Sequence, residues 1–62
     1  MNVYWYTGFW NMTRHDGYVV NWSTTLFTGQ VRAVVVITKS EDKYISIGTV
    51  VLVNSEDIHV KA

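Results

Sequence analysis

Hydrophobic positions in this chain fall in strand-like runs, and helical spacing is almost absent. Val, Ile, Thr, Tyr, Phe and Trp dominate the runs, and no Pro interrupts them. Residues of these types fit the pleated, half-buried surface of a β-strand. Apart from turns at Gly residues, only residues 39–43 and 55–57 have the polar composition of connections. The pattern therefore predicts an all-β protein.

The tripeptide His15-Asp16-Gly17 predicts the loop of a first hairpin, because strand-like segments lie on both sides of it. With Gly17 left-handed in a G1 bulge, the loop has three residues and pairs Trp10 with Trp22. A two-residue loop would mix polar with apolar partners, so we favour the bulged loop. One face of this hairpin is then apolar and is expected in the core. Its residues are Tyr4, Tyr6, Trp10, Met12, Tyr18, Val20, Trp22 and Leu26.

The opposite face of the same hairpin combines aromatic side chains with uncharged polar ones. In the favoured register Trp5 lies opposite Phe27, and Asn11 lies opposite Asn21. Aromatic side chains among Asn, Thr and Ser are suited to anchor a protein interface or to stack on a base or sugar. This face is therefore the expected binding surface. Its predicted binding residues are Trp5, Phe9, Asn11, Asn21, Thr25 and Phe27.

A second hairpin is expected from residues 31–38 and 44–53, which residues 39–43 connect. Gly29 marks the turn before it, and Ile58 with Val60 indicates a short final strand. Gly8 and Gly48, inside expected strands, would permit bulges or bends. We therefore expect residues 1–62 to form a single β domain. It would be a small curled antiparallel sheet or barrel of about five strands, two hairpins plus a short C-terminal strand.

The small size of the chain points to self-association. Sixty-two residues allow one small core, and domains of this size usually need a further source of stability. Without Cys, disulfides and Cys-rich zinc sites are excluded. The strand at residues 31–37 is also apolar on both sides, so one sheet cannot cover it. We therefore expect a homo-oligomer, most simply a dimer.

Charge and hydropathy exclude other classes of protein. Five Lys and Arg balance five Asp and Glu, and no basic block offers the clustered cations that bind phosphates. The longest apolar runs, residues 33–37 and 50–53, are far shorter than the roughly 20 residues of a membrane-spanning helix. Residues 1–10 lack the basic start of a secretory signal. We expect a cytoplasmic protein that does not bind membranes.

No group of residues has the spacing of a catalytic or metal site. Asp57 and His59 share one face of an expected strand, but a zinc site normally takes three or four protein ligands. His15 is the only other imidazole, and no nucleophile, base and orienting group stand at a recognisable spacing. The prediction is a protein that is not an enzyme, with no metal and no cofactor.

Three functions remain. The first is a non-catalytic protein-binding module, a small stand-alone regulator or inhibitor that occupies a partner protein's surface. The alternative is a single-stranded nucleic-acid binder that stacks bases on the aromatic side chains, with Arg14, Arg32, Lys39 or Lys43 meeting phosphates. A carbohydrate-binding module that uses the same aromatic residues is a weaker alternative.

Overall fold

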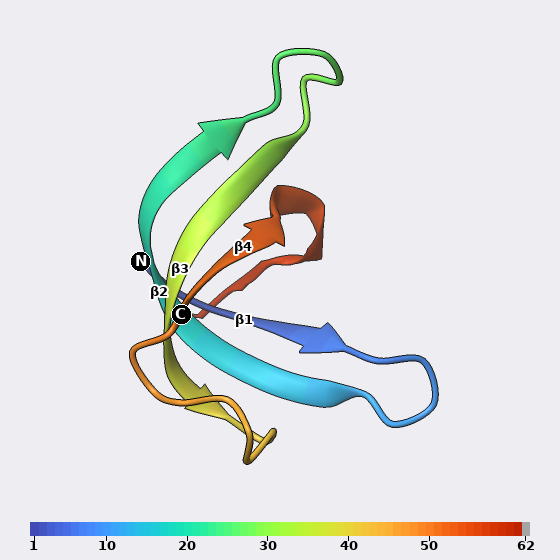
Figure 1. Cartoon of the computed structure of the whole chain (residues 1–62), viewed down its shortest axis with the longest axis vertical. Helices are drawn as coiled ribbons and strands as arrows, with labels where there is room; N and C mark the ends of the chain where they lie inside the picture. The colour runs from blue at the N-terminus through green and yellow to red at the C-terminus, as the bar shows by residue number, and fades with distance from the viewer. Residues whose placement is uncertain (62) are drawn as a thin grey trace.

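A single antiparallel sheet organises the protein in the computed structural model, which describes residues 1–61. The sheet has the strand order β4-β3-β2-β1-β5 and does not close on itself within these residues (Figure 1). The predicted all-β class and the curled sheet of five strands are confirmed. The elements are β1 (Asn2–Thr7), β2 (Thr13–Thr24), β3 (Val31–Ser40), β4 (Val50–Asn54), the 3₁₀ turn η1 (Ser55–Asp57) and β5 (His59–Val60).

The sheet is strongly curved around one side. In Figure 1, β2 and β3 run side by side along a curve, and the β1–β2 and β2–β3 loops extend away from the body of the molecule. The pairing between β2 and β3 shifts register between Asp16 and Gly17 and again between Val19 and Asn21. Such bulges bend a strand and increase its twist. They explain how one continuous sheet acquires a concave face that can enclose a core.

The predicted loop at His15-Asp16-Gly17 is wrong, because these residues lie inside β2. Trp5 of β1 pairs with His15, and Val3 pairs with Gly17. The connection between β1 and β2 is instead residues 8–12, where Gly8 has φ +98°. Gly17 does not have the positive φ that we expected; its lack of a side chain serves close packing. A Cβ atom at Gly17 would lie 2.8 Å from the Val36 carbonyl oxygen.

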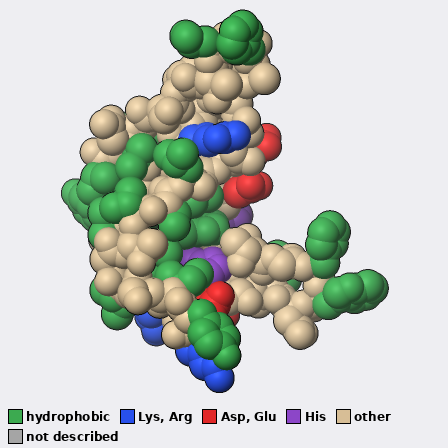
Figure 2. Space-filling view, in the orientation of Figure 1, with side chains coloured by type: hydrophobic (Ala, Val, Ile, Leu, Met, Phe, Trp, Pro, Cys, Tyr) green, Lys and Arg blue, Asp and Glu red, His purple; other side chains and the backbone are tan. Residues whose placement is uncertain are grey.

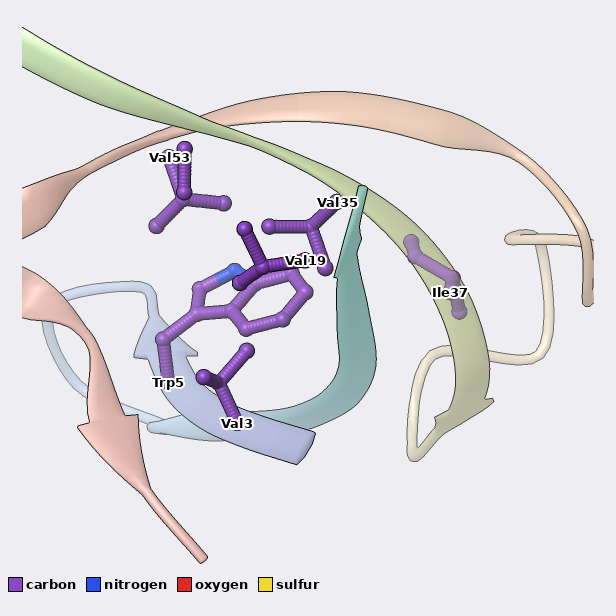
Figure 3. Close-up of a cluster of buried hydrophobic side chains, with 7 residues drawn as sticks. Val3, Trp5, Val19, Val35, Ile37 and Val53 are labelled. Atoms are coloured by element: carbon purple, nitrogen blue, oxygen red, sulfur yellow. The ribbon is translucent and has the colours of Figure 1, made fainter. Parts of the chain in front are cut away.

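The assignment of the two hairpin faces also changes, because moving the loop changes the register of the strands. The core lies on the concave face and surrounds the Trp5 indole (Figure 3). Its buried residues are Val3, Trp5, Val19, Ala33, Val35, Ile37 and Val53. Seven of the eight residues predicted for the core are 42–96% exposed, so that prediction is wrong. They are Tyr6, Trp10, Met12, Tyr18, Val20, Trp22 and Leu26.

The second hairpin forms, but its second strand begins later than expected. Residues 44–49 are a loop with turns, in which Gly48 has φ +93° and Ile45 packs against the core. Gly8 and Gly48 are thus turn residues and not bends inside strands. On β3, alternate side chains such as Val35 are buried, whereas those on the opposite face, such as Val34, are half-buried. One face of this strand therefore remains partly open to solvent.

The short fifth strand is confirmed, and it pairs with β1 rather than with β4. The connection expected at residues 55–57 is the 3₁₀ turn η1, which carries the chain from β4 across to β1. Among residues 1–61, no helix has the length and apolar character needed to cross a bilayer.

Candidate functional site: apolar side chains at two hairpin tips

Four large apolar side chains are almost completely exposed at the ends of two hairpins. Phe9 and Trp10 in the β1–β2 loop are 99% and 96% exposed, and Leu26 and Phe27 in the β2–β3 loop are 95% and 100% exposed. We call these four residues the hairpin tips. Figure 2 shows hydrophobic side chains at the two extremities of the molecule. Single exposed hydrophobic residues are ordinary, whereas contiguous exposed apolar patches are typical of interaction sites.

The β2–β3 tip is held by hydrogen bonds within its own loop. The Thr25 N–H donates to the Gln30 carbonyl at 2.9 Å, and the Gly29 N–H donates to the Thr25 carbonyl at 2.8 Å. Gly29 has φ +66°, a left-handed conformation that Gly adopts without strain. Because these bonds satisfy the loop backbone, the loop keeps its shape while Leu26 and Phe27 point into solvent.

The β1–β2 tip depends on Gly8. Its φ of +98° turns the chain directly after β1. A Cβ atom at this position would lie 2.8 Å from the Asn11 carbonyl oxygen, so the turn has no room for a side chain. The Thr13 hydroxyl donates a hydrogen bond of 3.4 Å to the Asn11 carbonyl. This local geometry places Phe9 and Trp10 at the outermost part of the loop.

Neither tip carries a charged residue. Residues 8–12 and 25–30 contain no Asp, Glu, Lys or Arg. Covering either tip would therefore remove apolar surface from water without the high cost of desolvating an ion. The tips are suited to an apolar contact with another molecule.

The predicted binding residues are distributed over three places and do not form one face. Phe9 and Asn11 lie in the first loop, Thr25 and Phe27 lie in the second, and Asn21 is exposed within β2, where its Oδ1 accepts the Trp22 N–H at 2.8 Å. The remaining predicted residue lies in the core.

Trp5, predicted as a binding residue, is only 5% exposed. Its ring stacks on His15 with 5.6 Å between centroids. It therefore supports the fold and exposes little surface. Sequence reasoning assigned Trp10 and Leu26 to the core and so missed half of the tip residues. The glycines that start or end each loop, Gly8 and Gly29, are the sequence signal that could have placed them in turns.

A buried polar group, His15, lies beside the core. One ring nitrogen, Nδ1, is 2.7 Å from the Ser40 hydroxyl, and the other, Nε2, is 2.8 Å from the Thr7 hydroxyl. The Ser40 oxygen also accepts the Asp42 N–H at 3.0 Å. Both ring nitrogens are therefore partnered, and within residues 1–61 no carboxylate is hydrogen-bonded to this ring to complete a triad. His15 joins three segments of the fold.

On the opposite face of the sheet, Asp16 joins the C-terminal segment to β2. Its two carboxylate oxygens accept hydrogen bonds from Arg14 Nε and from Lys61 Nζ, each at 2.9 Å. The bonds from Arg14 and then from Lys61 lower the pKa of Asp16 to about 2. The Arg14 guanidinium also lies 4.2 Å from the centre of the Tyr4 ring. Arg14 is therefore engaged within the protein, whereas the nucleic-acid alternative would use it to contact phosphates.

In the part of the chain that the structure describes, no three His, Asp or Glu side chains are grouped as metal ligands. Comparison with known proteins finds no family model, no curated protein and no solved structure that matches this chain.

Proposed function

We propose that this protein is a non-catalytic protein-binding module, a small cytoplasmic regulator or inhibitor that occupies a partner protein's surface through its hairpin tips. The observation that carries the proposal is the nearly complete exposure of Phe9, Trp10, Leu26 and Phe27. Large aromatic side chains dominate the energetics of protein interfaces, and charged residues are depleted from interface centres. The uncharged tips match both properties.

The total surface of the protein supports an interface of ordinary size. The accessible surface is 4704 Å² for a chain of 7.1 kDa, whereas a compact monomer of this mass exposes ~4,100 Å². The excess is roughly 600 Å², and each partner in a standard protein complex buries ~800 Å². The extended hairpins therefore expose about as much additional surface as one side of an interface covers.

Nucleic acid is a less suitable partner for these tips. Stacking on single strands combines aromatic platforms with cations that contact phosphates. Trp5 is buried, Arg14 is bonded to Asp16, and neither tip contains Lys or Arg. The same lack of cations makes the tips poorly suited to an anionic membrane, where basic residues supply much of the attraction.

The test uses paired serine variants of each tip in the full-length protein. Phe9→Ser with Trp10→Ser alters the first tip, and Leu26→Ser with Phe27→Ser alters the second. The matched control is Tyr44→Ser with Ile47→Ser, because these residues are also exposed, at 85% and 74%, but lie in the β3–β4 loop. All variants should retain the wild-type melting temperature, since none of these side chains contributes to the core.

The measurement is capture of the tagged protein from its source cells after chemical cross-linking, with the bound proteins quantified by mass spectrometry. We expect one stoichiometric protein partner with the wild type and the loop control, and at least tenfold less of it with either tip variant. Full retention of the partner by both tip variants would contradict the proposal. If the wild-type protein co-floats with phosphatidylcholine vesicles and the tip variants do not, the tips bind a lipid surface and not a protein.

A further inference from the structure

The two edges of the sheet differ in how they meet solvent. The strand order places β4 at one edge and β5 at the other. β5 has only two residues, whereas β4 has five and pairs only with β3. An edge strand directs every second pair of N–H and C=O groups away from its neighbour, where another strand can bind them. β4 is thus the longer of the two outermost strands, and its outer side has no partner strand.

The backbone groups that β4 presents can be identified from its pairing with β3. The Ile37 N–H donates to the Thr49 carbonyl at 2.9 Å, and the Gly48 N–H donates to the Ile37 carbonyl at 2.8 Å. Because hydrogen-bonded positions alternate along an antiparallel pair, Val51, opposite Val35, bonds to β3. The N–H and C=O groups of the next residue, Leu52, therefore point outward from the sheet.

β4 lacks the features that usually protect an edge strand. Proteins protect edges with charged residues, Pro, bulges or very short strands. The sequence of β4 is Val-Val-Leu-Val-Asn, with no charge and no Pro. β5, by contrast, is very short and is flanked by Asp57 and Lys61. Residues 20–24 of β2 also lack a partner on the side of β1, but β2 has a bulge between Val19 and Asn21. β4 carries none of these protections.

We propose that β4 pairs antiparallel with β4 of a second copy of this chain, about a two-fold axis at Leu52. Each Leu52 then donates to and accepts from its counterpart, and Val50 lies opposite Asn54 of the other copy. A two-fold contact brings the residues at the axis beside their own equivalents, so a charge there would repel its copy. The absence of charge from β4 removes this obstacle and favours a second copy as the occupant.

Side chains next to this edge add apolar surface to the contact. Val50 and Leu52 are 59% and 56% exposed on the face opposite the core. Val36 and Tyr18 continue the same row onto β3 and β2. Pairing of β4 would also enlarge a sheet whose own core is small.

This contact is separate from the hairpin tips, which lie in the loops before and after β2. The dimer and the partner complex can therefore be tested independently. Sedimentation velocity of the purified wild-type protein at about 100 μM should give a species of twice the 7.1 kDa chain mass. A stable 7.1 kDa species at that concentration would overturn the proposal.

The deciding variant is Leu52→Lys, which places two like charges beside the axis. We expect it to weaken the dimer at least tenfold, because like charges in contact oppose association. Tyr44→Lys is the control, since it adds the same charge away from β4 and should remain dimeric. An equimolar mixture of Leu52→Lys and Leu52→Glu should restore a dimer through charge attraction.

The mixture separates loss of pairing from loss of folding, because a misfolded variant would not be rescued by its opposite charge. Failure of the mixture to form a dimer, or a Leu52→Lys protein that remains fully dimeric, would overturn the two-fold contact at β4. If a substitution at Phe27 abolished the dimer and one at Leu52 did not, the two copies would contact each other through the hairpin tips and not through β4.

Discussion

Gly17→Ala tests whether this glycine serves close packing. Gly17 is buried where β1, β2 and β3 lie side by side. A Cβ atom there would collide with the Val35 side chain, lie 2.8 Å from the Val36 carbonyl oxygen and lie 3.3 Å from Cη2 of Trp5. The carbonyl belongs to the backbone of the paired strand, so it cannot move without disturbing the ladder. One added methyl group should therefore displace the sheet or the Trp5 ring.

The expected cost is large for a protein of this size. Overpacking of a core costs about 1–3 kcal/mol, and stability of roughly 0.05–0.15 kcal/mol per residue gives ~3–9 kcal/mol for the whole chain. For a domain this small, each kcal/mol shifts the melting temperature by about 4–8 °C. Thermal unfolding followed by circular dichroism should thus show Gly17→Ala melting roughly 4–24 °C below the wild type.

The matched control is Gly29, which has no atom within 4 Å of the position of its missing Cβ but has φ +66°. Gly29→Ala should cost about 1 kcal/mol from the left-handed backbone alone, and Gly29→Asn should cost less, because Asn tolerates this conformation. A Gly17→Ala melting temperature within about 1 °C of the wild type would refute the packing argument. A larger loss in Gly29→Ala than in Gly17→Ala would refute it as well.

Two further predictions concern the core and the ion pairs. Trp5→Ala should cost about 3–5 kcal/mol, whereas Trp10→Ala should change stability by no more than about 0.5 kcal/mol; urea unfolding of both variants checks this, and a silent Trp5→Ala would contradict the core assignment. Arg14 and Lys61 lower the Asp16 pKa from 3.8 to about 2, so the folded state gains stability from the ionised carboxylate above about pH 4 and loses it as the pH falls towards 2. Urea midpoints between pH 2 and 6 should show a smaller acid-induced loss for Asp16→Asn than for the wild type, and equal losses would contradict the linkage.

The strand content of this protein could be predicted from its sequence, but the first hairpin could not. Runs of β-branched and aromatic residues located most of β2, β3 and the short β5. Asp16-Gly17 looked like a turn because Gly is the usual residue at positive φ. Gly also occurs where two backbones or a bulky ring approach closely, and a sequence does not distinguish these uses. Here Gly17 allows close packing of β3 and Trp5, whereas Gly8 adopts the positive φ of the β1–β2 turn.

The candidate site was only half predictable for a related reason. Aromatic residues that form a core and those that form an interface have the same composition, so burial depends on where the hairpin turns. The sequence predicts the loop at residues 15–17, whereas the structure has it at residues 8–12. This difference in register places Trp5 in the core and leaves Trp10 exposed. Phe9 and Phe27 remained exposed because each lies in a loop. The bulges in β2, which set the curvature of the sheet, have no clear signal in the sequence.

The central claim is that the hairpin tips contact another protein, and site-specific photo-cross-linking in the source cells tests it most directly. A benzophenone amino acid replaces Phe27, Phe9 or, as a control, Tyr44, each in the full-length protein. The account predicts a cross-linked protein partner from positions 27 and 9 and none from position 44. Cross-links from position 44 alone, or adducts from the tips that contain lipid or nucleic acid without protein, would contradict it.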